Sequence, residues 1–139
     1  MARTKILVVD DEEDFGKALK VRLKASGYDV VLAHDSLQAI MMANLEKPDL
    51  ILLDIMIPGE DGFFVTEQLK QSQATQHIPI FFLTGVPGGE RRAHQLGASG
   101  YIMKPYHPEM LLETIHKALE IKGTQANQPK VDKTIGLGC

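Results

Sequence analysis

The stretches ILVVDD at residues 6–11 and LILLD at residues 50–54 decide the fold. In each, four apolar residues follow one another without polar alternation, and an acid comes directly after them. Uninterrupted apolar runs of this length are typical of parallel strands that are covered on both faces. The two stretches therefore predict two central strands of a parallel sheet, each ending in carboxylates.

Three further apolar runs, at residues 30–33, 80–83 and 101–103, alternate with segments of helical period. Strands that alternate with helices imply βαβ units with right-handed crossovers. We therefore predict a doubly wound α/β fold, with five parallel strands in the flavodoxin-like order 2-1-3-4-5 and helices on both faces. The first helix is expected to carry the apolar stripe Phe15, Leu19 and Leu23 and to end before Gly27, and the second to run from Asp35 to Asn44. The third should contain Phe63, Phe64 and Leu69, and the fourth should span Glu90–Leu96. The last should run from Pro108 to a cap at Gly123. Met41, Met42, Phe81 and Phe82 are expected in the core.

Length and composition predict one globular domain at residues 1–123 and a flexible tail at 124–139. The net charge of −3 argues against direct nucleic-acid binding, which needs a basic face. The single cysteine, Cys139, excludes a disulfide framework. The first apolar run is too short for a secretory signal, and no run approaches the roughly 18 residues that span a bilayer. These features favour a cytoplasmic protein with no membrane contact.

Polar side chains follow the predicted strands at their carboxyl ends, which is where ligands bind in open parallel sheets. They are Asp10 and Asp11 after the first strand, Asp54 after the third, Thr84 after the fourth, and Lys104 after the fifth. Clustered carboxylates repel each other unless a cation intervenes. A hard divalent cation resolves this repulsion, and Mg²⁺ is typically held by one or two carboxylates together with substrate phosphate.

This group of residues also fits phosphoryl transfer. Asp54 can attack a phosphoryl group as a carboxylate nucleophile and form an acyl phosphate. Catalysis of such a step is mostly positioning and charge stabilisation. Mg²⁺ can cover one phosphoryl oxygen, the Lys104 ammonium a second, and the Thr84 hydroxyl a third.

The segments ILVVDDEED, PDLILLDIMIPGEDG, PIFFLTG and GASGYIMKPY together resemble the response regulator receiver domain, the CheY-like family, over Lys5 to Lys122. The resemblance implies that Asp54 is the phosphoacceptor, and that a histidine kinase or a histidine phosphotransfer protein is the donor. It implies Asp10, Asp11, Asp54 and the main-chain carbonyl of Met56 as Mg²⁺ ligands. It also implies a protein of two-component phosphorelay signalling that modifies only itself and is not an enzyme of metabolism.

The resemblance further implies a switch. On phosphorylation Thr84 would move toward the phosphoryl group and Tyr101 would rotate inward, which would reshape an output surface for an unknown downstream protein or for a phosphorylation-dependent homodimer. A packing tyrosine without a switching role is the other interpretation of Tyr101. Lys104–Pro105 resembles the cis peptide of the family.

Two features depart from the family pattern. The segment Gly-Val-Pro-Gly-Gly after Thr84 predicts a fourth helix that starts late and is short, which puts the standard output mode in question. Met56 and Val86 occupy positions that flank the phosphoryl group in the family, and neither side chain can orient an attacking water. We therefore expect slow self-dephosphorylation.

Other interpretations remain open. A pseudo-receiver that keeps the fold without phosphorylation is the main alternative, although the complete set of site residues argues against it. A flavodoxin would need a hydroxyl- and glycine-rich loop after the first strand, where this sequence has acids. A haloacid-dehalogenase-type phosphatase would need a second Asp at position 56, where this sequence has Met56. The five histidines lack the spacing of a zinc site. Whether the chain stands alone or is cut from a longer protein does not follow from its sequence.

Overall fold

The computed structural model describes residues 3–127, which form two compact units, one ending at His107 and the other beginning at Pro108. Strands and helices alternate along the chain, as the periodicity predicts. In order they are β1 (Lys5–Val9), α1 (Glu13–Ala25), β2 (Asp29–Ala33), α2 (Ser36–Glu46), β3 (Leu50–Leu53), α3 (Gly62–Gln71), β4 (Ile80–Thr84), α4 (Glu90–Gln95), β5 (Gly100–Met103) and α5 (Pro108–Asn127). Among these residues, no helix is both long and apolar enough to cross a membrane.

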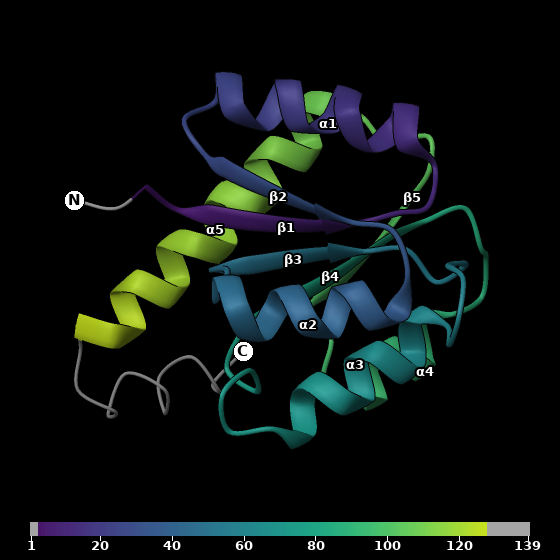
Figure 1. The fold of residues 1–139 in the computed structure, drawn as a ribbon. Helices are drawn as coiled ribbons and strands as arrows, with labels where there is room; N and C mark the ends of the chain where they lie inside the picture. The colour runs from purple at the N-terminus through teal and green to yellow at the C-terminus, as the bar shows by residue number, and fades with distance from the viewer. Residues whose placement is uncertain (1–2, 128–139) are drawn as a thin grey trace. The chain divides into compact units, whose positions relative to one another are not determined.

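The sheet of the first unit has the order β2-β1-β3-β4-β5, with every neighbouring pair parallel (Figure 1). This confirms the predicted doubly wound topology. The strand order reverses between β1 and β3, because β2 lies on one side of β1 while β3, β4 and β5 follow on the other. Such a reversal opens a crevice at the carboxyl ends of β1 and β3.

Helices cover both faces of this sheet within the first unit. On one face, alternate strand residues such as Leu7, Ile51 and Phe82 pack with buried residues of α2, α3 and α4. The residues between them point to the other face, where α1 lies and buries Leu19 and Leu23 (Figure 1). The four residues of β3 are all buried, which explains their uninterrupted apolar sequence.

Three predictions about helices need correction. The second helix runs beyond Asn44 to Glu46. Helix α5 continues through Gly123 to Asn127, so Gly123 is not its cap. One interior glycine costs only about 1 kcal/mol, which flanking helix formers offset. The predicted tail at 124–139 therefore begins within this helix, and residues 128–139 lie outside the described residues. Met41 is 47% exposed and does not belong to the core.

Gly62 at the start of α3 lies against the backbone that carries Asp54. A Cβ at this position would come within 2.4 Å of the Asp54 carbonyl oxygen and 2.9 Å of Ile55 Cα. Backbone atoms cannot turn aside as a flexible side chain can, so Gly62→Ala should lower the free energy of unfolding by about 2–3 kcal/mol. Urea unfolding measures this change. Gly85→Ala is the matched control, because its Cβ would meet no atom within 4 Å; equal losses for both variants would contradict the prediction.

Candidate functional site

The register of the sheet brings Asp10 and Asp54 together. Val9 pairs with Leu53, so the next residue on each strand is an aspartate at the same edge. The Asp54 amide donates to the Val9 carbonyl at 3.0 Å, and the Asp10 amide donates to the Ala33 carbonyl at 3.0 Å. These bonds continue the strand pairing by one residue and fix both acids at the crevice where the strand order reverses.

Three carboxylates form one cluster at this edge. Oxygen atoms of Asp10, Asp11 and Asp54 all lie within 4.8 Å of one another. Asp10 and Asp54 are buried, whereas Asp11 is exposed. The cluster therefore has two acids held in the protein and one that faces solvent.

The amine of Lys104 lies between the two buried acids. Its Nζ donates to Asp10 Oδ2 at 2.6 Å and to Asp54 Oδ2 at 3.1 Å, and it approaches the exposed Glu12 at 3.5 Å. Lys104 follows β5, its amide donates to the Thr84 carbonyl at 2.8 Å, and the Lys104–Pro105 peptide is cis, the isomer that the family resemblance implies. Three strand ends thus converge on one ammonium group.

Burial and pairing act on the pKa values of this group in opposite directions. Burial raises the pKa of the Asp10 carboxyl, and the hydrogen bond from Lys104 only partly offsets that rise. Burial alone would lower the pKa of the Lys104 amine, but its hydrogen bonds to Asp10 and Asp54 outweigh burial and raise it. The amine therefore stays charged, and it supplies the positive charge that allows acids to be buried side by side.

The ring of Phe15 lies beneath the same ammonium group. Lys104 Nζ is 4.1 Å from the centre of this ring, within the range of a cation–π contact. Tyr106 packs edge-on against Phe15, with ring centres 5.9 Å apart and planes at 88°. Sequence reasoning assigned Phe15 to an apolar helix stripe, and it assigned no role to Tyr106 or Glu12. The only signal in the sequence was an aromatic residue one helical turn after the acids and another two residues after the lysine.

Thr84 and Tyr101 lie beside the carboxylate cluster rather than in its hydrogen-bond network. Thr84 is fully buried, and its hydroxyl accepts from the Val86 amide at 3.3 Å. The Tyr101 hydroxyl donates to the Val86 carbonyl at 2.5 Å, and burial raises the pKa of this hydroxyl. Both side chains therefore contact the loop after β4. No hydrogen bond joins Thr84 to Asp54 in the described part of the chain.

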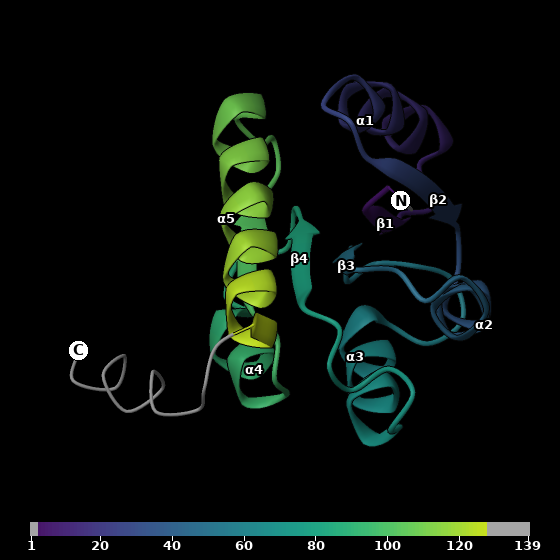
Figure 2. The ribbon, with the colours of Figure 1, turned by 90° about the vertical axis from the view of Figure 1, so that its left-hand side faces the viewer.

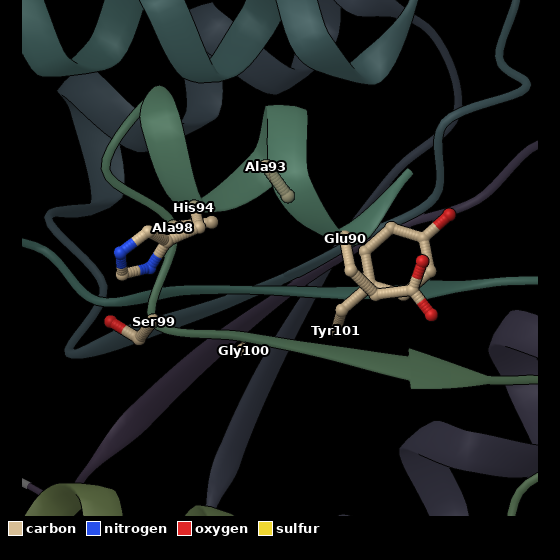
Figure 3. A pocket seen from close by; sticks show the side chains of 7 residues that line it. All are labelled: Glu90, Ala93, His94, Ala98, Ser99, Gly100 and Tyr101. Atoms are coloured by element: carbon tan, nitrogen blue, oxygen red, sulfur yellow. The ribbon is translucent and has the colours of Figure 1, made fainter. Parts of the chain in front are cut away.

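Tyr101 also lines a pocket of about 80 Å³ between α4 and β5 (Figure 3). Glu90 and His94 of α4 and Ser99 line it as well. Helix α4 has only six residues, which agrees with the short helix that the glycines before it predict. Arg92 of α4 lies over the Phe63 ring at 4.5 Å, so this short helix is also held against α3.

Met56 follows Asp54 by two residues and contacts it through the main chain. Its amide donates to Asp54 Oδ1 at 3.3 Å, and its side chain is 67% exposed. No polar side-chain atom is therefore offered at this position. The role of its carbonyl as a metal ligand stays a prediction.

The donor set fits a magnesium ion. Three carboxylates with oxygens within 4.8 Å offer hard oxygen ligands, which Mg²⁺ prefers over nitrogen or sulfur. The burial of Asp10 and Asp54 holds two of these donors in place, and the exposed Asp11 leaves a side open for water or a phosphoryl oxygen. Asp10, Asp11 and Asp54 would hold the ion.

Comparison with known proteins identifies the family of the chain. A family model described as the response regulator receiver domain matches residues 6–116. The response regulator PleD of Caulobacter vibrioides is 40% identical over 120 residues, which cover 85% of this chain and 26% of PleD. The polar-differentiation response regulator DivK of Brucella anthropi is 35% identical over 116 residues, which cover 82% of this chain and 94% of DivK. The chain thus spans nearly all of DivK but about a quarter of PleD.

A solved structure shows the same fold. The receiver domain of the sensor histidine kinase PA1611 from Pseudomonas aeruginosa PAO1 is 27% identical, with a TM-score of 0.78 and coverage of 86% of this chain and 99% of that domain. That protein holds a magnesium ion in its active site cleft. Since the family model matches most of the chain, and the sheet order agrees with it, the chain belongs to the response regulator receiver domain family.

Proposed function

We propose that this protein accepts a phosphoryl group on Asp54 from a histidine kinase or a histidine phosphotransfer protein, in a magnesium-dependent reaction. One observation carries the proposal: the Lys104 amine is held between Asp10 and Asp54 at 2.6 and 3.1 Å, with Asp11 in the same cluster. A fold gains little stability from buried paired charges that could be apolar. Their retention at the sheet edge favours a role in chemistry.

The residues have distinct parts in this reaction. An oxygen of Asp54 forms a bond to phosphorus while the bond from phosphorus to the donor's imidazole nitrogen breaks, and the electron pair of that bond stays on the nitrogen. Lys104, already 3.1 Å from Asp54, stabilises negative charge on the phosphoryl oxygens. Magnesium, when bound by Asp10, Asp11 and Asp54, supplies further positive charge there. Thr84 moves toward the phosphoryl group and donates a hydrogen bond from its hydroxyl to a phosphoryl oxygen. In doing so it leaves the Val86 amide, from which its oxygen now accepts.

Under this proposal the protein is a switch that modifies itself and turns over no metabolite. Movement of Thr84 would loosen the loop at Val86, which Tyr101 also holds, and would alter the pocket between α4 and β5. The charge added at Asp54 would thus favour one of two arrangements of the loop at Val86. The downstream protein would read this surface. The single cysteine of the present chain and its proposed phosphoryl donor, a histidine kinase or phosphotransfer protein, fit a protein of the cytoplasm.

Uptake of a phosphoryl group by the purified chain tests the proposal. Phosphoramidate, whose phosphorus is bonded to nitrogen as in phosphohistidine, serves as the probe together with acetyl phosphate. The expected result is an intact mass increased by one phosphoryl group in the presence of Mg²⁺, reversed by hydroxylamine and absent with EDTA. Calorimetry should also detect magnesium binding. If the protein neither takes up a phosphoryl group nor binds magnesium, the pseudo-receiver interpretation would be supported instead.

Phe15→Leu should slow this reaction by loosening the Lys104 ammonium. A cation–π contact contributes about 0.5–2 kcal/mol, so we expect a rate roughly 2- to 30-fold lower. Phe15→Tyr keeps the ring and should restore the rate. The ε-methylene protons of Lys104 should also lose their ring-current shift in the leucine variant, which NMR measures without phosphorylation. An equal effect of Phe15→Leu in a Lys104→Met background would show that the ring acts elsewhere.

Met56→Asn should shorten the lifetime of the phosphorylated protein. The exposed methionine offers no hydrogen bond to an attacking water, whereas an amide at this position can orient one. We expect dephosphorylation to become faster by on the order of tenfold. Loss of the label over time after removal of the donor measures this rate. Met56→Leu is the control for size alone, and an unchanged lifetime in the asparagine variant would contradict the prediction.

A further inference from the structure

Helix α2 has apolar side chains on its outer side as well as on the side that packs against the sheet. Ala39 and Ala43 are fully buried. On the outer side, Leu37, Met41 and Leu45 are 72%, 47% and 69% exposed. Their spacing of four residues places these three side chains along one line of the helix. We refer to Leu37, Met41 and Leu45 as the α2 stripe.

The α2 stripe is unusual for a surface helix, whose outer face is normally charged or polar. The only charged residue within α2 is Glu46, which pairs with Lys5 of β1 at 2.8 Å. Gln38 and Asn44 flank the stripe, and neither is charged. Contiguous exposed apolar side chains mark interaction sites.

No part of residues 3–107 covers the α2 stripe. Figure 1 and Figure 2 both show α2 at the outside of the first unit, next to α3, with no strand or helix of this unit beyond it. The exposed fractions of Leu37 and Leu45 agree with this arrangement. Within the first unit the stripe is therefore open to a second molecule.

We propose that this second molecule is another copy of the same chain, with the two α2 helices antiparallel and Met41 on the two-fold axis. The sequence around Met41 is symmetric in character: Leu37 and Leu45 lie four residues to either side, and Gln38 and Asn44 lie three residues to either side. A two-fold interface requires a surface that is complementary to itself. In this arrangement each leucine lies opposite the other leucine of the second copy, and no charged side chain of α2 falls between them.

The charges at the two ends of α2 favour the antiparallel direction. Asp35 caps the start of the helix, where its side chain accepts from the Gln38 amide at 2.7 Å, and the exposed Lys47 caps its end. Each lies six residues from Met41. The antiparallel arrangement brings Asp35 to the same end as Lys47 of the second copy, while a parallel one would place like charges together. Charge therefore selects one orientation of the two.

The interface is small. Three large side chains from each copy cover much less than the roughly 1,000 Å² that stable interfaces exceed. We expect weak association, with a dissociation constant on the order of 100 μM. The interface uses neither the strand ends nor the α4–β5 pocket, so it does not depend on the proposed phosphorylation.

Sedimentation velocity of the full chain with Cys139→Ser tests the proposal over a range of concentrations. The expected result is a dimer that forms as concentration rises, and whose dissociation constant increases at least about tenfold in Met41→Lys. Val21→Lys is the matched control, since Val21 is an apolar residue of α1 that is 71% exposed. It should leave the dimer unchanged, and Met41→Gln should weaken the dimer without adding charge.

Cross-linking tests the orientation. In the Cys139→Ser background, Met41→Cys should form linked dimers with a short bismaleimide, and Val21→Cys should not. A mixture of Leu37→Cys and Leu45→Cys chains should link to each other more than either links to itself. The proposal would be overturned if the chain stays monomeric at high concentration, or if Met41→Lys leaves the dissociation constant of the dimer unchanged. The α2 stripe would then bind a different protein. Preferential Leu37–Leu37 links would overturn the antiparallel arrangement.

Discussion

Asp54→Asn is expected to abolish phosphoryl uptake while the protein stays folded. The amide has the size of the carboxylate, and its oxygen can still accept from the Met56 amide, which now donates to Asp54 Oδ1. An amide is not a nucleophile at this position, so no acyl phosphate can form. Intact mass after incubation with phosphoramidate and Mg²⁺ should equal that of the untreated variant.

The control for this variant is Asp14→Asn, which changes an exposed acid in the first turn of α1 by the same atoms. It should take up phosphoryl at the rate of the unchanged protein. Circular dichroism should show that both variants keep their secondary structure. Persistent uptake by Asp54→Asn would assign the nucleophile to another acid, with Asp11 the first to examine because it lies in the same cluster.

The convergence of the site residues could be predicted because strand ends obey a simple rule. Once five parallel strands and their order are assigned, the residue after each strand lies at one edge, and the sequence places acids and a lysine there. The structure brings Asp10, Asp11, Asp54 and Lys104 together as this rule predicts. Alternation of strands and helices predicts only that the strands are parallel; the order with β2 outside β1 was predicted as the flavodoxin-like one of the doubly wound folds.

The contacts of single side chains could not be predicted in the same way. Phe15 continues the spacing of Leu19 and Leu23, so periodicity assigns it to the core, yet its ring lies against the Lys104 ammonium. Met41 was likewise assigned to the core from the sequence. Its neighbour Met42 packs against the core while Met41 points outward, and the sequence cannot separate them because α2 is apolar on both sides. Periodicity distinguishes faces only where their polarity differs.

Lys104→Met is expected to have two opposite effects. The side chain is largely buried, and methionine has similar length and remains favourable against the Phe15 ring. Loss of the ammonium removes a donor from the phosphoryl oxygens, so we expect uptake to slow by about 10²- to 10³-fold. Magnesium affinity should instead rise, because the amine now engages oxygens of Asp10 and Asp54 that the ion would otherwise use.

These opposite signs separate a role in chemistry from damage to the structure. A distorted site would lose magnesium affinity and phosphoryl uptake together, whereas removal of a competing charge raises the first and lowers the second. Calorimetry with Mg²⁺ and the initial rate with phosphoramidate measure the two effects on the same preparation. Lys24 is an exposed lysine of α1, and Lys24→Met should change neither the magnesium affinity nor the rate of phosphoryl uptake. If both quantities fall in Lys104→Met, the amine acts mainly as the structural partner of the buried Asp10, whose charge is then left without its closest cation.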